Sequence, residues 1–253
     1  MKYLVIGSTS DIAQEFISCI AASDPSAEVI TFSRSIDSHI KIDWTSGYTP
    51  IQSSQYSLIQ DWDVLISFVG SQSPIGQIHL CNPHDIISGV NINFTFQFAL
   101  ISELLRFRNP KNTNKIVLFA GGGTNSAPIF YSTYIASKIA LIKLTELIYA
   151  EYPDVHSTIV GPGWVKTKIH SATLSVTGET KTPASYRETK RRFAENDFVP
   201  MTQVISCIST ILSESSPKFA GRNISVQHDS WHDENFLATA STDDSHYKLR
   251  RLS

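Results

Sequence analysis

A tyrosine and a lysine stand four residues apart in the stretch FAGGGTNSAPIFYSTYIASK, which runs from Phe119 to Lys138. Residues at positions i and i+4 share one face of a helix, so we expect the Tyr134 hydroxyl and the Lys138 ammonium to face one ligand. A free tyrosine, with a pKa of about 10, is poorly matched to proton transfer near neutrality. A cation about 4 Å away stabilises the phenolate by about 4 kcal/mol, which lowers the tyrosine pKa by about 3 units. The pair therefore predicts acid and base catalysis by Tyr134.

The elements that position this pair are short apolar runs that alternate with longer stretches of helical periodicity. The apolar runs cover 3–6, 29–32, 64–69, 116–119, 155–160 and 224–226, and the helical stretches cover 12–22, 86–105, 132–149 and 204–212. This alternation predicts the α/β class, with a doubly wound parallel β-sheet that has helices on both faces. Ligands bind to such sheets just beyond the carboxyl ends of the strands, where the strand order reverses. The residues that follow each strand are therefore the candidates for a binding site.

The first strand ends in a turn that is suited to a phosphate. Gly7 follows the strand directly, and a helix opens near Asp11, so backbone N–H groups are expected to face a pyrophosphate at the start of that helix. Only Gly7 of the three expected glycines is present, because Asp11 and Ala13 occupy the later two places. The alternative is a plain strand-to-helix turn, capped by Ser10 or Asp11.

The second strand ends in an arginine. Arg34 follows Ser33 at the position where an acidic residue would bind the ribose hydroxyls of NAD. An arginine here can instead pair with the 2′-phosphate of NADP, so we predict that NADP(H) is preferred and that NAD(H) is possible. The alternative is an ordinary solvent-facing loop arginine.

Composition indicates which partners and locations to expect. The 253 residues, of which 42% are hydrophobic and 17% charged, suit one domain over 1–253. A formal net charge of -2 indicates no attraction to nucleic acid or membrane, and no run approaches the roughly 20 apolar residues of a membrane span or forms a signal-peptide core, so we expect a cytoplasmic protein. The three cysteines, Cys19, Cys81 and Cys207, and the spacing of the histidines fit neither a disulfide framework nor a metal site.

Several motifs, taken in order, resemble those of the short-chain dehydrogenase/reductase family, in its single-domain branch of about 250 residues. The matching segments are GSTSDIA from Gly7, Asp43 in KIDW at the adenine-contacting aspartate, DVLISFVG from Asp63 to Gly70 in place of a strand ending in Asn-Asn-Ala-Gly, Asn91 in VNI, YIASK, and GPGWVKT with Thr167. The resemblance runs from Lys2 to about Trp231 and is weakest from Ile169 to Pro200. It implies a Rossmann-like fold, a nicotinamide cofactor and the interconversion of a carbonyl and an alcohol on a small-molecule substrate, in a homodimer or homotetramer.

The resemblance also implies the roles of individual residues. The catalytic residues are Tyr134, Lys138, which also binds the nicotinamide ribose, and Asn91, which holds a water that relays protons from the lysine. The implied cofactor-binding residues are Gly7, Ser8, Thr9, Ser10, Asp11, Ile12, Arg34, Asp43, Phe68, Val69, Gly70, Tyr134, Lys138, Pro162, Gly163, Val165 and Thr167.

The catalytic serine of that family is missing. It usually lies thirteen residues before the tyrosine, where this chain has Gly121. Losing one hydrogen-bond donor to the substrate oxygen typically costs about 2 to 4 kcal/mol, or roughly a hundredfold or more in rate. Thr124 or Ser126, on the same loop, can be hypothesised to supply the hydroxyl. The alternative is a catalytically impaired NADP(H)-binding protein that acts as a sensor or scaffold.

Residues 166–200 correspond to the variable substrate lid of the resembling family. Their basic residues are Lys166, Lys168, Lys181, Arg187, Lys190, Arg191 and Arg192, which would favour an anionic substrate such as a nucleotide sugar. The alternative is a solvated helix face with salt bridges to Glu188 and Glu195. We expect His170 to be a surface residue and the polar segment 241–253 to be a solvated tail or an arm docking on a neighbouring subunit.

Overall fold

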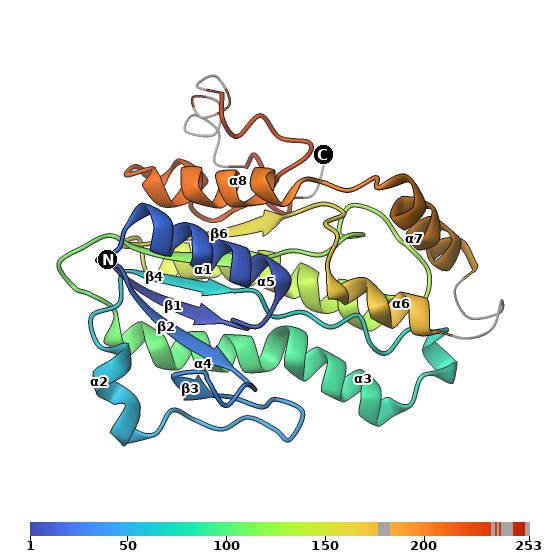
Figure 1. Cartoon of the computed structure of the whole chain (residues 1–253), viewed down its shortest axis with the longest axis horizontal. Coiled ribbons are helices and arrows are strands. Elements are labelled where there is room, and N and C mark those ends of the chain that lie inside the picture. Colours follow the sequence, from blue (N-terminus) through green and yellow to red (C-terminus); the bar gives the residue numbers. More distant parts are fainter. Residues whose placement is uncertain (177–182, 234–235, 237, 239–244, 251–253) are drawn as a thin grey trace.

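The computed structural model describes residues 1–176, 183–233, 236, 238 and 245–250 (Figure 1). Seven strands form one parallel sheet in the order β3-β2-β1-β4-β5-β6-β7. The strands are β1 (Lys2–Ile6), β2 (Glu28–Ser33), β3 (Ile40–Lys41), β4 (Val64–Ser67), β5 (Asn114–Phe119), β6 (Val155–Gly161) and β7 (Arg222–Ser225). The strand order reverses between β1 and β4, so the ligand site of such a sheet is expected beside the ends of these two strands. The predicted doubly wound parallel sheet is confirmed.

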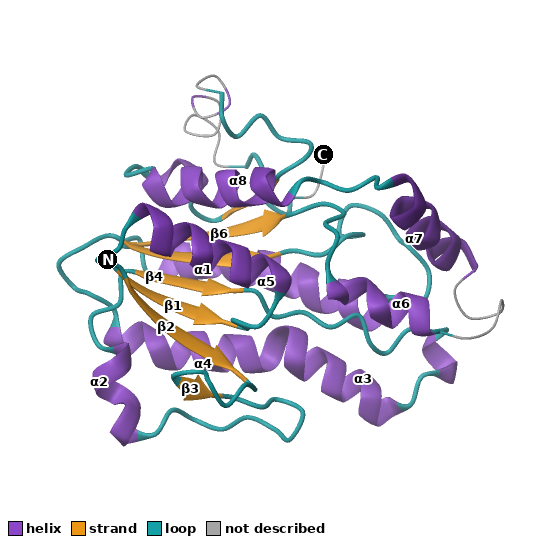
Figure 2. Cartoon of the chain, viewed as in Figure 1, coloured by secondary structure: helices purple, strands orange, loops and turns teal. Residues whose placement is uncertain are grey.

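Helices cover both faces of the sheet (Figures 1 and 2). They are α1 (Asp11–Ser23), α2 (Tyr56–Ile59), α3 (Pro83–Val90), α4 (Phe96–Leu104), α5 (Ser132–Glu151), α6 (Ser171–Ser175), α7 (Pro183–Glu195) and α8 (Met201–Ser213). Short 3₁₀ turns cover Ser53–Gln55, Ile78–Leu80, Leu105–Phe107, Lys168–His170 and Pro217–Phe219. Residues of α4 and α5 belong to one hydrophobic core and residues of α1 and α8 to the other. None of the helices in the described part of the chain is long and apolar enough to span a membrane.

The two cores follow from alternation along the strands. In β1, Leu4 and Ile6 pack into the core with α4 and α5, whereas Tyr3 and Val5 pack into the core with α1 and α8. Successive side chains of a strand point to opposite faces, and a sheet covered on both faces therefore needs apolar residues at nearly every position. This is why continuous apolar runs in the sequence predicted the strands.

The predicted helical stretch 86–105 is not one continuous α-helix. A π-helical turn, Asn91–Thr95, separates α3 from α4. The Asn93 amide donates to the Gly89 carbonyl over 2.9 Å, and the Gln97 amide donates to the Asn93 carbonyl over 2.7 Å. π-helical turns inside α-helices frequently mark functional sites.

The described end of the polar tail lies against its own chain. The Tyr247 carbonyl accepts a hydrogen bond from the Asn223 backbone N–H over 2.8 Å, and the Tyr247 ring packs 4.6 Å from that of Phe236. Arg250 forms an ion pair with Glu146 on α5. Residues 245–250 thus contact β7 and α5 of their own chain, while Ser245, His246, Leu249 and Arg250 remain exposed.

Candidate active site

A cavity of about 320 Å³ lies beyond the carboxyl ends of β4, β5 and β6, under α6 and the start of α7. Of the residues predicted to bind cofactor or to act in catalysis, it is lined by Ile12, Phe68, Val69, Gly70, Tyr134, Lys138, Pro162, Gly163, Val165 and Thr167. The remaining predicted residues, Gly7, Ser8, Thr9, Ser10, Asp11, Arg34, Asp43 and Asn91, do not line it. Most of the predicted site thus lies around one hollow, and the remainder lies on the neighbouring turns and helices.

The turn after β1 has the geometry of a phosphate-binding turn and also a helix cap. Gly7 has a positive φ of 73°, and a Cβ at this position would lie 3.0 Å from the Val69 Cγ2 atom. The Ser10 hydroxyl caps α1 by accepting from the Ala13 N–H over 3.2 Å. The Ser10 cap that the alternative interpretation predicted is therefore present.

Lys168 ties the beginning of the lid to this turn. Its backbone N–H donates to the Asp11 carboxylate over 2.6 Å, and its ammonium lies 3.6 Å from the same carboxylate. The ammonium also bonds to the Thr9 carbonyl. The segment after β6 is therefore fastened to the turn after β1 by one residue.

Arg34 and Asp43 lie together outside the cavity, beyond β2 and β3. Both side chains are exposed. The Thr45 hydroxyl and backbone N–H bond to the Asp43 carboxylate and lower its pKa, and the charge of Arg34 contributes in the same direction. Arg34 is therefore an accessible cation whose charge acts on an ionised carboxylate.

Tyr134 and Lys138 are buried side by side on α5. The Lys138 ammonium donates to the Val69 carbonyl over 3.0 Å and lies 5.8 Å from the centroid of the Tyr134 ring. Burial raises the pKa of Tyr134 to about 12 and lowers the pKa of Lys138 to about 7. The expectation of a lowered Tyr134 pKa is thus wrong for the protein alone, since burial disfavours both charged forms.

The Tyr134 ring occupies the space of the missing serine side chain. A Cβ atom at Gly121 would lie 2.5 Å from Tyr134 Cε1 and 2.6 Å from its hydroxyl oxygen. Real Cβ atoms essentially never approach other atoms this closely, so any side chain at position 121 must displace the tyrosine. Tyr134 can therefore occupy this position only because residue 121 is a glycine and not the serine.

Restoring the serine is expected to impair the protein. We predict that Gly121→Ser and Gly121→Ala each lower turnover about tenfold, because the new Cβ displaces Tyr134 and an overpacked core costs about 1 to 3 kcal/mol. Steady-state kinetics and thermal unfolding measure the effect. Gly122→Ala is the matched control, since nothing lies within 4 Å of a Cβ at Gly122. Higher turnover in Gly121→Ser would contradict the prediction.

Of the two loop hydroxyls considered as substitutes for the serine, Ser126 lines the cavity and Thr124 does not. Four polar residues that the sequence did not single out also line it, namely Gln72, Tyr131, Thr173 and Ser185. Tyr131 precedes Tyr134 by three residues and is the N-cap residue of α5, so its closeness to Tyr134 in the sequence was the available signal.

Asn93, two residues after Asn91, contacts the loop after β4. Asn93 is completely buried, and its side chain exchanges two hydrogen bonds of 2.8 Å with the backbone N–H and carbonyl of Ser71. Asn91 is only partly buried and forms no side-chain hydrogen bond to the described residues. Asn93 lies on the stripe of buried residues that continues through Gln97 and Leu104, and this periodicity distinguishes the two asparagines.

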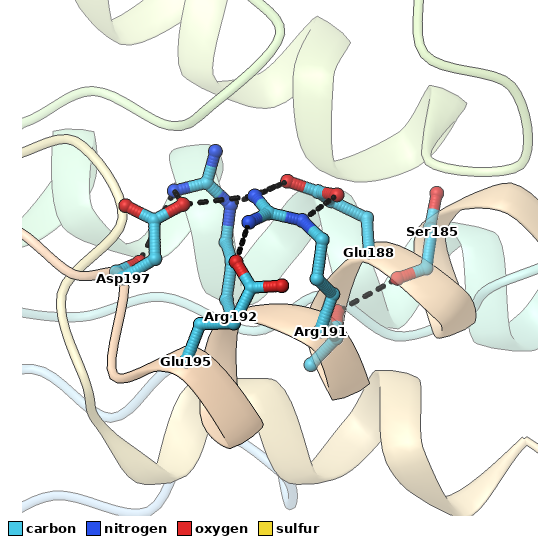
Figure 3. Close-up of polar contacts among 7 residues, drawn as sticks. Ser185, Glu188, Arg191, Arg192, Glu195 and Asp197 are labelled. Atoms are coloured by element: carbon cyan, nitrogen blue, oxygen red, sulfur yellow. Dashed lines mark hydrogen bonds and ion pairs between the residues drawn. The ribbon is translucent and has the colours of Figure 1, made fainter.

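Residues of α7 and Asp197, which follows it, form a compact network of guanidinium and carboxylate groups (Figure 3). Arg191 pairs with Glu188, Glu195 and Asp197, and Arg192 pairs with Glu188 and Asp197. Hydrogen bonds from Arg191, followed by those from Arg192, lower the pKa of Glu188 to about 2. These pairs are the alternative foreseen for the basic lid, in which the positive charge is balanced within the helix face. Lys181 lies outside the described residues.

His170 is a wall residue of the cavity and not a surface residue, so the sequence-based expectation is wrong. Only 6% of its surface is exposed, and its ring stacks on that of Trp164 with centroids 5.1 Å apart. The Nε2 atom donates to the Val165 carbonyl over 2.9 Å, whereas Nδ1 has no hydrogen-bond partner among the described residues. Burial lowers the pKa of His170, which favours the neutral ring.

The sequence matches a known enzyme family. The model of the short chain dehydrogenase family matches residues 43–176, more than half of the sequence. The chain therefore belongs to the short-chain dehydrogenase/reductase family of oxidoreductases, as predicted. No curated protein matches the sequence.

Solved structures share the fold at low sequence identity. A short chain dehydrogenase/reductase from Saccharomyces cerevisiae is 17% identical, with a TM-score of 0.78 over 91% of this chain and 97% of its own. 4-Hydroxyisoleucine dehydrogenase complexed with NADH is 21% identical, with a TM-score of 0.68 over 88% of this chain and 96% of its own. Actinorhodin polyketide ketoreductase with NADPH is 18% identical, with a TM-score of 0.68 over 89% of this chain and 95% of its own.

Proposed function

We propose that the protein is an NADP(H)-dependent oxidoreductase that interconverts a carbonyl and an alcohol, with Tyr134 as general acid and base. The observation that carries the proposal is the burial of Tyr134 and Lys138 together on α5, facing one cavity beside the reversal of strand order. Membership of the family supports oxidoreductase chemistry. The NADH and NADPH bound to two proteins of the same fold support a nicotinamide cofactor.

The residues around the cavity fit such a cofactor. The buried Lys138 ammonium has no carboxylate partner among the described residues, which suits it to the ribose hydroxyls. Gly7 and Gly163 have positive φ values of 73° and 74°, and a Cβ at Gly163 would lie 2.7 Å from the Val199 side chain, so backbone alone fits there. We propose that the cofactor is held by the seventeen residues from Gly7 to Thr167 that the resemblance implies.

Tyr134 is suited to give a proton in the reducing direction. A nicotinamide cofactor held by the residues named above would supply the hydride that reduces the carbonyl carbon. The pKa of about 12 keeps the Tyr134 hydroxyl protonated near neutral pH, so it donates its proton to the carbonyl oxygen, which becomes the alcohol. The charged form of Lys138 stabilises the phenolate that remains, and the proton returns from solvent. In the oxidising direction the same phenolate accepts the alcohol proton.

We assign to Asn93 a positioning role in place of the role that the resemblance gave to Asn91. Its two hydrogen bonds fix Ser71, which follows the Val69–Gly70 segment that contacts Lys138. Asn93 thereby acts through the loop after β4.

We further propose that residues 1–253 form one NAD(P)-binding domain in which 166–200 is the substrate lid, that the protein is a cytoplasmic homodimer or homotetramer, and that it uses no metal. The described lid balances much of its positive charge internally, and Lys138 is the one charged side chain among the described residues of the cavity wall. This favours an uncharged, sugar-like substrate over an anionic one.

Cofactor consumption tests the proposal. Purified protein is assayed with NADPH and NADH against a panel of ketones that includes nucleotide-linked keto sugars, simple hydroxy ketones and β-ketoacyl thioesters. We expect turnover with NADPH. In Arg34→Asp the KM for NADPH rises about tenfold or more, because a charge-assisted hydrogen bond contributes about 1.5 to 3 kcal/mol, while kinetics with NADH change little. An unchanged NADPH preference in Arg34→Asp would mean that Arg34 is an ordinary loop residue.

A further inference from the structure

Three side chains from separate segments form a hydrogen-bonded chain in the cavity wall. Gln72 lies in the loop after β4, Tyr131 directly precedes α5, and Thr173 lies on α6 of the lid. The Tyr131 hydroxyl lies 2.8 Å from Thr173 Oγ1, which donates to Gln72 Oε1 over 3.0 Å. Thr173 and Tyr131 are 2% and 7% exposed, so these contacts are shielded from bulk water.

The direction of these bonds determines which atoms remain for a ligand. Thr173 has a single O–H, and it is used toward Gln72 Oε1. The Thr173 oxygen therefore accepts from the Tyr131 hydroxyl. The lone pairs of the Tyr131 oxygen and the two N–H donors of Gln72 Nε2 are left over, and these donors bond to no described residue. The Tyr131 end of this hydrogen-bonded chain therefore accepts a hydrogen bond from a ligand, and the Gln72 end donates one.

The chain lies close to the proposed catalytic group. Tyr131 is the N-cap residue of α5, and Tyr134 lies in the first turn of that helix. Both line the same cavity. A substrate whose oxygen is bound at Tyr134 therefore lies in the same cavity as Tyr131 and Gln72.

We propose that Gln72, Tyr131 and Thr173 form a subsite for a neutral hydroxyl group one or two carbons from the substrate carbonyl. A hydroxyl both donates and accepts, which matches the atoms that the chain leaves over. The subsite contains no charged group, so a carboxylate or phosphate in this place would be buried without a counter-charge. The substrate class is therefore hydroxy ketones and their diols, an inference that rests on the function proposed for Tyr134.

The first test measures binding without turnover. Trp164 lies in the cavity wall, so its fluorescence reports the titration of cyclohexane-1,2-diol and of cyclohexanol, two alcohols that differ by one hydroxyl. We expect the wild-type protein with NADP bound to bind the diol about tenfold more tightly, because a polar site rejects a ligand that lacks the matching group. In Thr173→Val and Gln72→Met this preference falls to about twofold or less, while cyclohexanol binds as before.

Two control variants distinguish recognition of the ligand hydroxyl from a role of these side chains in holding α6 in place. Thr173→Ser keeps the hydroxyl and is expected to keep the preference. Ser175→Ala removes an exposed hydroxyl from the same helix and is expected to change nothing. If Thr173→Val binds both alcohols equally more weakly and has a lower Tm, the three side chains only hold α6 in place. If both Thr173→Val and Gln72→Met keep the preference for the diol, the proposal is overturned.

The second test uses reduction of 2-hydroxycyclohexanone and cyclohexanone with NADPH. We expect kcat/KM to favour the hydroxy ketone about tenfold in the wild type and about equally in Thr173→Val. Diol binding that discriminates as expected, with no ketone reduced, would contradict the proposed function and leave the subsite intact. Reduction of both ketones at equal rates would leave the function intact and refute the subsite.

Discussion

Replacing Tyr134 with phenylalanine lowers kcat for carbonyl reduction by about a hundredfold to ten-thousandfold and leaves the affinity for NADPH almost unchanged. The change removes one hydroxyl from a buried ring, so the cavity keeps its shape and loses its acid. Losses of this size are typical when a positioned acid or base is removed. We expect a large effect because position 121 is a glycine, so no hydroxyl at that position remains to bind the substrate oxygen once the Tyr134 hydroxyl is removed.

Steady-state kinetics and NADPH titration measure the two parts of this expectation. Tyr149→Phe is the matched control, because Tyr149 lies at the far end of the same helix and packs on His156. Turnover in Tyr134→Phe at the wild-type rate would refute the proposed role. NADPH binding by the wild-type protein with no turnover on any substrate would instead support the sensor or scaffold function.

Replacing Lys138 with methionine abolishes most of the turnover and is expected to stabilise the fold below neutral pH. Burial lowers the pKa of Lys138 from 10.5 to about 7, so between these values the unfolded chain binds a proton that the folded chain does not. Stability of the wild type therefore rises with pH across this window, and below pH 7 the full cost of the buried charge, about 5 kcal/mol, is present. Methionine removes that cost, but the Val69 carbonyl loses its hydrogen bond, which costs about 1 to 3 kcal/mol. The free energy of unfolding below pH 7 is therefore higher by about 2 to 4 kcal/mol in the variant.

Thermal unfolding of both proteins from pH 6 to pH 10 tests this expectation. The Tm of Lys138→Met should exceed that of the wild type by about 5 °C or more at pH 6, and the difference should shrink as the pH rises. Lys143→Met, at an exposed lysine on the same helix, should show no such dependence. A Met variant that is less stable at pH 6, or whose advantage grows with pH, would contradict the buried charge.

The sheet and the position of the site were predictable from the sequence because both depend on local patterns. Strands covered on both faces need continuous apolar runs, and residues that follow parallel strands meet at one edge. The Tyr134 and Lys138 spacing likewise fixes their shared face on α5. These features depend on residues close together in the chain.

The errors in the sequence-based prediction arose where distant segments meet. The contact between Gly121 and the Tyr134 ring depends on the path of the loop between β5 and α5, which no local pattern encodes. His170 reads as an isolated polar residue, and only the packing of Trp164 and the lid makes it a wall of the cavity. The pKa of Tyr134 was predicted from one nearby charge, whereas the burial that raises it is a property of the whole fold.

The choice between Asn91 and Asn93 lies between these cases. The motif VNIN offers two asparagines, and the resemblance places the role on the first. Buried positions at Gly89, Asn93 and Gln97 recur every four residues, which is a pattern that the sequence contains. It was missed because the stretch was taken as a uniform α-helix.

The π-helical turn Asn91–Thr95 also constrains how the length of this chain can change. A π-helical turn holds one residue more than an α-helical turn would need. Deleting a single residue within it would leave a regular α-helix, yet each residue of such a helix turns by about 100°, so α3 would rotate by that angle relative to α4. The Asn93 side chain could then no longer donate hydrogen bonds to the Ser71 carbonyl and to the Gly89 carbonyl at the same time. The extra residue of the π-helical turn is therefore an insertion that the chain cannot lose without breaking these bonds. In a sequence alignment with relatives that have a regular α-helix here, the gap belongs within residues 91–95.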